Sequence, residues 1–126
     1  RELHGLLRRQ RQICIRDRST KQKVEFLSGG QRQSIAIGKA ISSNPEVLIM
    51  DEPTSALAIA EVESVLRLIN EVKKRGVSVI LITHRLQDIF KVCDRVTVMF
   101  EGKDVADKSI QELDLNKLVS LIVQEH

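Results

Sequence analysis

Two adjacent carboxylates follow a short apolar run near the middle of the chain. Asp51 and Glu52 come directly after Val47–Met50, and Pro45 and Pro53 bound this segment. A continuous apolar run is typical of a strand that is buried on both faces. At the end of such a strand, one carboxylate can hold a hydrated Mg²⁺ together with phosphate oxygens, and the other can polarise an attacking water. Two solvated acids at a strand end are the alternative for this pair taken by itself.

A turn with two glycines precedes a predicted helix. We call it the glycine turn, and its residues are Leu27, Ser28, Gly29, Gly30 and Gln31. Glycines let a backbone approach a polyanion closely, and a helix N-terminus offers free N–H groups and the positive end of the helix dipole. Ser28 can add a hydroxyl donor or simply cap the helix. An ordinary loop is the alternative for a Ser-Gly-Gly turn that stands alone.

A histidine follows a second apolar run. His84 comes directly after Val77–Thr83, which we predict to be a buried strand. At this place a ring N–H could contact phosphate. A single histidine is also compatible with a purely structural role.

Strands and helices alternate along the chain and must position these residues. Apolar residues at helical spacing predict an amphipathic helix over Val62–Val72, between the two strands. Val96–Phe100 is predicted to be a third strand, and helices are predicted at Leu86–Cys93 and Leu115–Ile122. Strands joined by helical crossovers pair in parallel, and chemistry gathers outside their carboxyl ends. We therefore predict an α/β fold with a mostly parallel sheet, flanking helices and the three strands as neighbours.

Composition excludes several classes of protein. The 126 residues are 42% hydrophobic and 29% charged, which is ordinary for a single soluble domain and argues against wholesale disorder. The chain has three Phe and no Trp or Tyr, which argues against an aromatic surface that stacks on bases or sugars. Its two cysteines form no disulfide framework, and we expect a reduced, cytosolic chain without a signal peptide or a membrane span.

The positive charge of the chain belongs to one end. Residues 1–23 carry a net charge of +6 and the remaining residues −3, which gives +3 in total. Such an end is typical either of a nucleic-acid contact or of a solvated, poorly ordered segment. We therefore divide the chain into a basic N-terminal segment, 1–26, and a folded part, 27–126.

The order of the three candidate segments resembles the nucleotide-binding domain of ABC (ATP-binding cassette) ATPases. Leu27 and Asp51 are 24 residues apart, and Asp51 and His84 are 33 residues apart, so each interval has room for one helix and one strand. The resemblance runs from about Phe26 to Val123. From the D-loop onward it is strongest to the ATPase subunits of monosaccharide importers.

The resemblance implies a role for each candidate residue. The glycine turn matches the family's signature motif, which contacts the ATP of a partner subunit. Val47–Asp51 matches the Walker B strand, with Asp51 supporting Mg²⁺ through water, and Glu52 matches the catalytic glutamate. His84 matches the switch histidine that senses the γ-phosphate. The start of the family's D-loop is matched by Ser55, Ala56 and Leu57.

The chain departs from the family pattern in three places. Ala58 stands where many members have the D-loop aspartate. No Gly-x-x-x-x-Gly-Lys-Ser/Thr segment occurs, so the chain has no Walker A. Residues Arg8–Lys23 do not resemble the family's helical segment before the signature. We therefore expect an incomplete P-loop NTPase-like fold, an ABC cassette that lacks its N-terminal part.

The resemblance also implies partners and cofactors. ATP and Mg²⁺ are the expected cofactors, and a second ABC ATPase domain is expected to join head to tail. Transmembrane permease subunits are the expected partners for transport, at the cytoplasmic face of the membrane, with no nucleic acid. The implied function is ATP hydrolysis coupled to import, and sugars are the expected substrates.

Two alternatives to the importer stay open at the level of sequence. A non-transport ABC ATPase that acts on nucleic acid or the ribosome would make use of the basic residues 1–23. A catalytically incompetent fragment that serves only as a partner surface would explain the missing Walker A.

Overall fold

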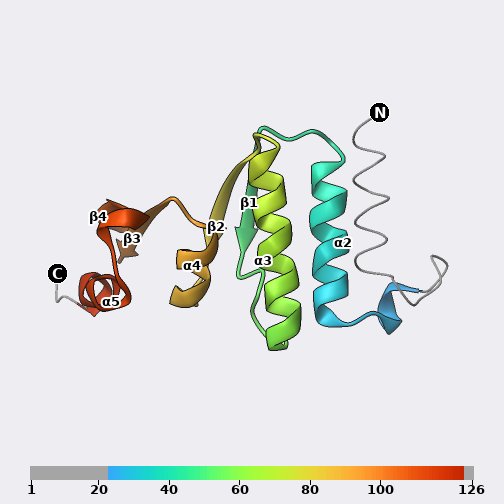
Figure 1. Cartoon of the computed structure of the whole chain (residues 1–126), viewed down its shortest axis with the longest axis horizontal. Helices are drawn as coiled ribbons and strands as arrows, with labels where there is room; N and C mark the ends of the chain where they lie inside the picture. The colour runs from blue at the N-terminus through green and yellow to red at the C-terminus, as the bar shows by residue number, and fades with distance from the viewer. Residues whose placement is uncertain (1–22, 124–126) are drawn as a thin grey trace. The chain divides into compact units, whose positions relative to one another are not determined.

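The computed structural model describes residues 23–123, which form two compact units, one ending at Ile82 and the other beginning at Thr83 (Figure 1). Most of the predicted basic segment 1–26 lies outside the described residues. The first unit contains η1 (Val24–Phe26), α2 (Gly29–Ile41), β1 (Val47–Asp51), α3 (Ile59–Lys74) and β2 (Ser78–Ile82). The second unit contains α4 (Leu86–Val92), β3 (Arg95–Phe100), β4 (Lys103–Ser109), η2 (Ile110–Glu112) and α5 (Leu115–Val123).

Helix α2 begins at a reciprocal capping box. The Gln31 N–H donates to Ser28 Oγ at 3.2 Å, and the Ser28 N–H donates to Gln31 Oε1 at 3.0 Å. This arrangement satisfies two backbone donors that the first turn would otherwise leave without a partner. At the other end Asn44 takes a φ of 52°, and Pro45 follows it. The predicted helix after the glycine turn is confirmed.

Helix α3 confirms the amphipathic pattern and has an unusual start. Its apolar face is fully buried, and the residues of that face are Val62, Val65, Leu66, Ile69 and Val72. Gly76, just past the end of the helix, has the left-handed φ of 86° that glycine adopts most easily. The N-cap residue is Ala58, whose methyl group cannot accept a hydrogen bond. Half of a capping box remains, because the Ala58 N–H donates to Glu61 Oε2 at 3.1 Å.

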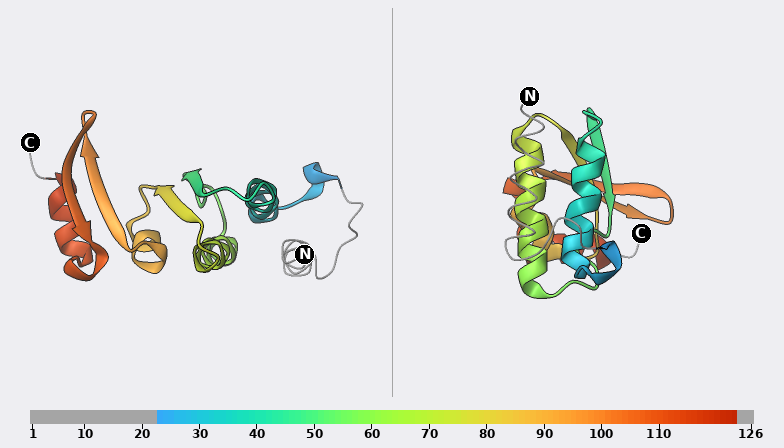
Figure 2. Two further views of the ribbon diagram at one scale, coloured as in Figure 1. Left: turned by 90° about the horizontal axis from the view of Figure 1, so that it is seen from above. Right: turned by 90° about the vertical axis from the view of Figure 1, so that its right-hand side faces the viewer.

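Strands β1 and β2 pair in parallel, as predicted, from Val47 beside Ser78 to Asp51 beside Ile82. Helix α3 covers one face of this pair, the face on which Met50 is buried, and α2 packs beside α3 (Figure 2). The other face is open: Ile49 is 64% exposed and Ile80 is 51% exposed. The expectation that both faces are covered is therefore wrong for the described residues, because their helical layer lies on one side only.

Strand β3 forms a separate sheet in the second unit. It pairs antiparallel with β4, which sequence analysis did not predict, so the expectation that it neighbours the other two strands is wrong. Glu101 and Gly102 link the strands, with φ values of 48° and 78°. Two consecutive residues of positive φ make the tight turn that matches the twist of a hairpin. Such a turn returns the chain directly beside β3 as an antiparallel strand. A helical crossover to a parallel neighbour therefore does not form here.

A small core holds the second unit together. Ile89 of α4, Val96 and Val98 of β3, and Leu118 of α5 are buried against one another. The predicted helices at 86–93 and 115–122 are confirmed. Among residues 23–123, each helix is too short or too polar to cross a membrane.

The start of α3 leads to a prediction about stability. Ala58→Ser places a hydroxyl acceptor at the N-cap and completes a Ser-x-x-Glu capping box with Glu61. We expect the free energy of unfolding to rise by about 0.5–2 kcal/mol, as measured by urea denaturation. Ala60→Ser, the same change inside the exposed first turn, is the matched control and should give no gain. An equal effect of the two substitutions would contradict the proposed cap.

Candidate functional site

The glycine turn lies at the N-terminus of α2, where backbone N–H groups point out of the helix. Leu27 precedes the helix, and its carbonyl accepts a hydrogen bond from Arg32 Nη1 at 3.1 Å. Ser28 acts as the N-cap, so the capping role considered from sequence is confirmed. Because Ser28 Oγ accepts from Gln31, its hydroxyl proton is left for another acceptor, the carboxylate of Glu61.

The two glycines are also required by packing against the start of α3. A Cβ at position 30 would lie 2.6 Å from the Cβ of Glu61, which is too close for any real contact. A Cβ at position 29 would lie 2.8 Å from Leu57 Cδ2, which is the end of a flexible side chain. From the sequence, the glycines were expected either to allow the approach of phosphate or to form an ordinary loop. The structure adds a steric reason that is strict at Gly30 and milder at Gly29.

The carboxylate of Glu61 connects the glycine turn to the start of α3. The Gly30 N–H donates to Glu61 Oε1 at 3.3 Å, and the Ala58 N–H donates to Oε2. The pKa of Glu61 is lowered, first by a hydrogen bond from the Ser28 side chain and then by the Ala58 and Gly30 N–H groups, with Arg32 adding a smaller attraction. The carboxylate is therefore held in its charged form by donors of the glycine turn.

Asp51 and Glu52 lie where β1 ends, but their backbones differ. Asp51 is the last residue of the strand, and its side chain is exposed. Glu52 leaves the strand with a φ of 48°, an uncommon conformation for a non-glycine residue, and its N–H donates to the Ile82 carbonyl at 2.8 Å. Its Oε2 atom is buried. Backbone strain of this kind clusters at functional sites, so it supports the hypothesis that Glu52 has a functional role.

The loop from Glu52 to α3 contains the three residues matched to the D-loop. The Ser55 N–H and hydroxyl both donate to the Glu52 carbonyl, at 3.1 and 2.9 Å. Ala56 has a φ of 58°, and Leu57 approaches Gly29. The first unit therefore brings the end of β1, this loop and the glycine turn into one connected chain of contacts.

His84 belongs to the second unit and is exposed in the turn before α4. The residues on both sides of it are held in place. The Arg85 N–H donates to Thr83 Oγ1 at 3.0 Å, and Arg85 Nε forms an ion pair with the buried Asp88 at 3.0 Å. These contacts restrict the backbone that carries the imidazole.

The donors at the end of β1 suit Mg²⁺. This ion uses one or two carboxylates and fills its other positions with water and phosphate oxygens. Asp51 supplies an exposed carboxylate, and Glu52 follows it directly. Within residues 23–123 no three His, Cys, Asp or Glu side chains gather into a metal-binding group. The exposed carboxylate of Asp51 fits a metal that water and a phosphate ligand would also hold.

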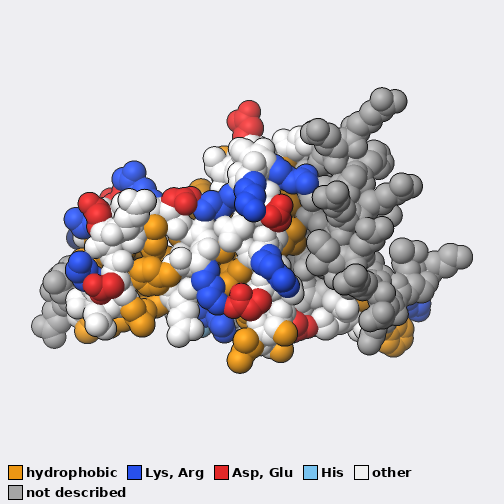
Figure 3. Space-filling model, in the orientation of Figure 1, with side chains coloured by type: hydrophobic (Ala, Val, Ile, Leu, Met, Phe, Trp, Pro, Cys, Tyr) orange, Lys and Arg blue, Asp and Glu red, His pale blue; other side chains and the backbone are white. Residues whose placement is uncertain are grey.

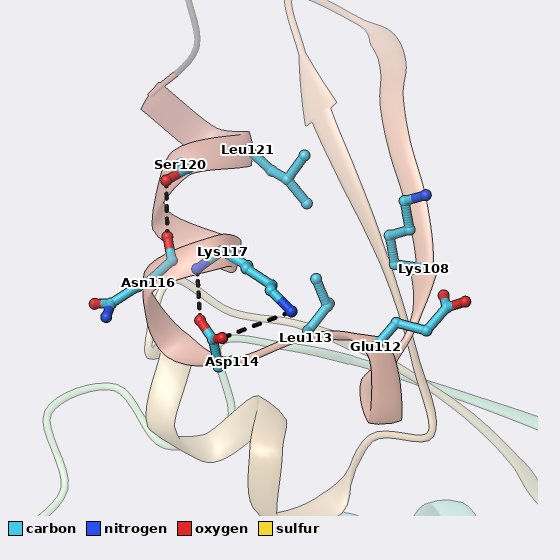
Figure 4. Close-up of a pocket in the computed structure, with 8 residues that line it drawn as sticks. All are labelled: Lys108, Glu112, Leu113, Asp114, Asn116, Lys117, Ser120 and Leu121. Carbon is cyan, nitrogen blue, oxygen red and sulfur yellow. Dashed lines mark hydrogen bonds and ion pairs between the residues drawn. The ribbon is translucent and has the colours of Figure 1, made fainter.

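A pocket of about 550 Å³ lies in the second unit and contains none of the predicted site residues (Figure 4). Its walls carry Lys108, Glu112, Asp114 and Lys117. Lys117 is engaged by Asp114, whose carboxylate also accepts the Lys117 N–H at 2.8 Å at the start of α5. These charges serve the helix start, and we assign the pocket no role.

Sequence analysis missed Glu61 as a site residue. The signal that could have found it is a glutamate at the third position of a helix, the second half of a capping box. Ala58 removed the first half of that pattern, so the helix start was not recognised there.

The comparisons with known proteins agree with the family resemblance. The family model described as ABC transporter matches residues 1–55, so the match includes residues Arg8–Lys23, in which the sequence alone showed no resemblance to the family. The ribose import ATP-binding protein RbsA of Bacillus subtilis is 44% identical over 105 residues, 83% of this chain and 21% of that protein. The galactose/methyl galactoside import ATP-binding protein MglA of Haemophilus influenzae is 40% identical over 107 residues, 85% of this chain and 21% of that protein. The chain thus spans about a fifth of these relatives.

Solved structures show the same fold. A nucleotide-free ATP-binding cassette from an ABC transporter matches 98% of this chain with a TM-score of 0.76 and 25% identity, over 51% of its own length. A dimeric ATP-binding cassette in a post-hydrolysis state with ADP and Pi matches 82% of this chain with a TM-score of 0.65 and 26% identity, over 47% of its own length. The α/β fold is therefore that of an incomplete P-loop NTPase-like cassette, and most of the chain is similar in sequence to ATP-binding proteins of ABC transporters.

Proposed function

We propose that this sequence is the C-terminal part of the ATP-binding subunit of an ABC importer, and that its substrate is a sugar. One observation carries the proposal: the glycine turn at the start of α2 is packed against the loop that follows the Asp51-Glu52 pair. The turn that we propose contacts the ATP of a second domain and the carboxylates that we propose act on this domain's own ATP thereby belong to one connected region. The sugar assignment is supported by the ribose and galactose import relatives.

In the proposed reaction, water attacks the γ-phosphate of ATP in line with the leaving group. Glu52 accepts the proton of that water, and the imidazole of His84 donates a hydrogen bond to the transferring phosphoryl group. Asp51 would hold Mg²⁺ through water, and the bound metal would supply positive charge that neutralises the phosphate oxygens. The N-terminus of α2 contributes N–H groups and its dipole to an ATP molecule that a second ATPase domain holds.

The proposal includes a head-to-tail pair of ATPase domains. A solved relative forms a dimer in the presence of ADP and Pi, which supports this arrangement. Permease subunits that span the membrane complete the proposed importer, with this domain at its cytoplasmic face. Figure 3 shows basic and acidic side chains interspersed over the described surface of the first unit.

Glu52 provides the decisive test of this chemistry. In the full-length subunit, Glu52→Gln keeps the size of the side chain and removes the base. We expect ATP hydrolysis to fall by a factor on the order of 10²–10⁴ while ATP binding persists, so that an ATP-bound dimer accumulates. Steady-state ATPase rates and light scattering with Mg-ATP measure the two effects.

Asp51→Asn is the companion variant and should behave differently. Loss of the metal-holding carboxylate weakens the dependence on Mg²⁺ as well as the rate. Turnover close to wild type in Glu52→Gln would rule out Glu52 as the base. Identical behaviour of the two variants would contradict the division of roles between the neighbouring carboxylates.

A separate prediction concerns residues 1–126 alone. Without a Walker A motif they lack the lysine and the backbone amides that cradle ATP phosphates. We expect calorimetric titration with Mg-ATP to show weak binding and an ATPase assay to show negligible turnover. Micromolar affinity with steady hydrolysis would contradict the proposal that a further segment supplies the phosphate cradle.

A further inference from the structure

The glycine turn already binds an anion in this structure, and that anion is the carboxylate of Glu61. The Gly30 N–H donates to Oε1 at 3.3 Å, and the Ser28 side chain hydrogen-bonds to the same carboxylate. Both donors belong to the segment that the proposed function assigns to nucleotide phosphate. In the structure their partner is therefore this carboxylate.

The electrostatics of Glu61 show that this place favours negative charge. Its pKa is lowered, with the Ser28 hydrogen bond as the largest cause, and Arg32 also attracts the carboxylate. A helix N-terminus adds its own positive dipole. The interactions that hold Glu61 in its charged form are the interactions that would stabilise a phosphate.

The same donors cannot serve both anions in full. The Ser28 hydroxyl has one proton and the Gly30 backbone has one N–H, so a phosphate that takes them must displace the carboxylate. Two negative groups at hydrogen-bond distance from the same donors also repel each other. Building on the proposed function, we propose that Glu61 competes with nucleotide phosphate for the Ser28 and Gly30 donors and thereby sets the ATP affinity of the closed dimer.

The contacts indicate how the exchange occurs. The bond from Gly30 is long at 3.3 Å, whereas the bond from Ala58 to the other carboxylate oxygen is 3.1 Å. Glu61 gives up the longer bond and remains attached to the start of its own helix.

The experiment compares ATP-driven dimerisation in two variants of the full-length subunit. Both carry Glu52→Gln, so that hydrolysis does not reopen the dimer, and one also carries Glu61→Gln. The amide is isosteric but uncharged, and a hydrogen bond to a neutral group is weaker than one to a charged group. We expect the Mg-ATP concentration for half-maximal dimerisation to fall roughly three- to tenfold. Glu63→Gln, the same change at an exposed site two residues away, is the matched control and should leave the midpoint unchanged.

The outcomes separate this inference from the proposed function. If the Glu52→Gln subunit forms no dimer with ATP, the proposed function fails. If it dimerises but Glu61→Gln leaves the midpoint unchanged or raises it, the competition is overturned. Should Glu61→Gln fold poorly in a thermal unfolding assay, Ala58→Ser with Glu61→Ala replaces it, because the hydroxyl introduced at position 58 then caps α3 without Glu61. The same fall in the midpoint is expected from that pair, and an unchanged or higher midpoint again overturns the competition.

Discussion

The close approach between the starts of α2 and α3 is the constraint on which the rest of the candidate site depends. Gly30 allows it, because any larger residue would collide with the Cβ of Glu61. The approach brings a carboxylate to the helix N-terminus and the loop residue Leu57 against Gly29. A single steric requirement thus places the N–H donors of α2, the Glu61 carboxylate and the loop before α3 within reach of one another.

The turn after β1 is held in a conformation that it would not adopt unaided. Glu52 and Ala56 both have positive φ, at a cost of roughly 1–2 kcal/mol each for residues other than glycine. Hydrogen bonds from the Glu52 N–H to Ile82 and from Ser55 to the Glu52 carbonyl hold this path. Because the surrounding hydrogen bonds hold this strained backbone, the Glu52 side chain leaves it in one fixed direction. A carboxylate that acts in catalysis requires such a fixed direction.

The apolar pattern of β1 and β2 fits a larger domain than the one that the described residues form. Its apolar runs have the character of strands covered on both faces, yet Ile49 and Ile80 lie exposed on the face opposite α3. The solved cassette that matches 98% of this chain is about twice as long. The pattern of these strands is therefore that of the whole cassette fold, of which the described residues supply one helical layer.

The amino-acid sequence by itself determined the helices, the parallel strand pair and the family resemblance, because these follow from local periodicity and from motifs in a specific order. It also offered capping as one role of Ser28, but it did not predict the β3–β4 hairpin. The role of Glu61 was decided only by the tertiary structure. Glu61 and Gly30 are 31 residues apart, and no local pattern records a contact between two helix ends that packing alone brings together.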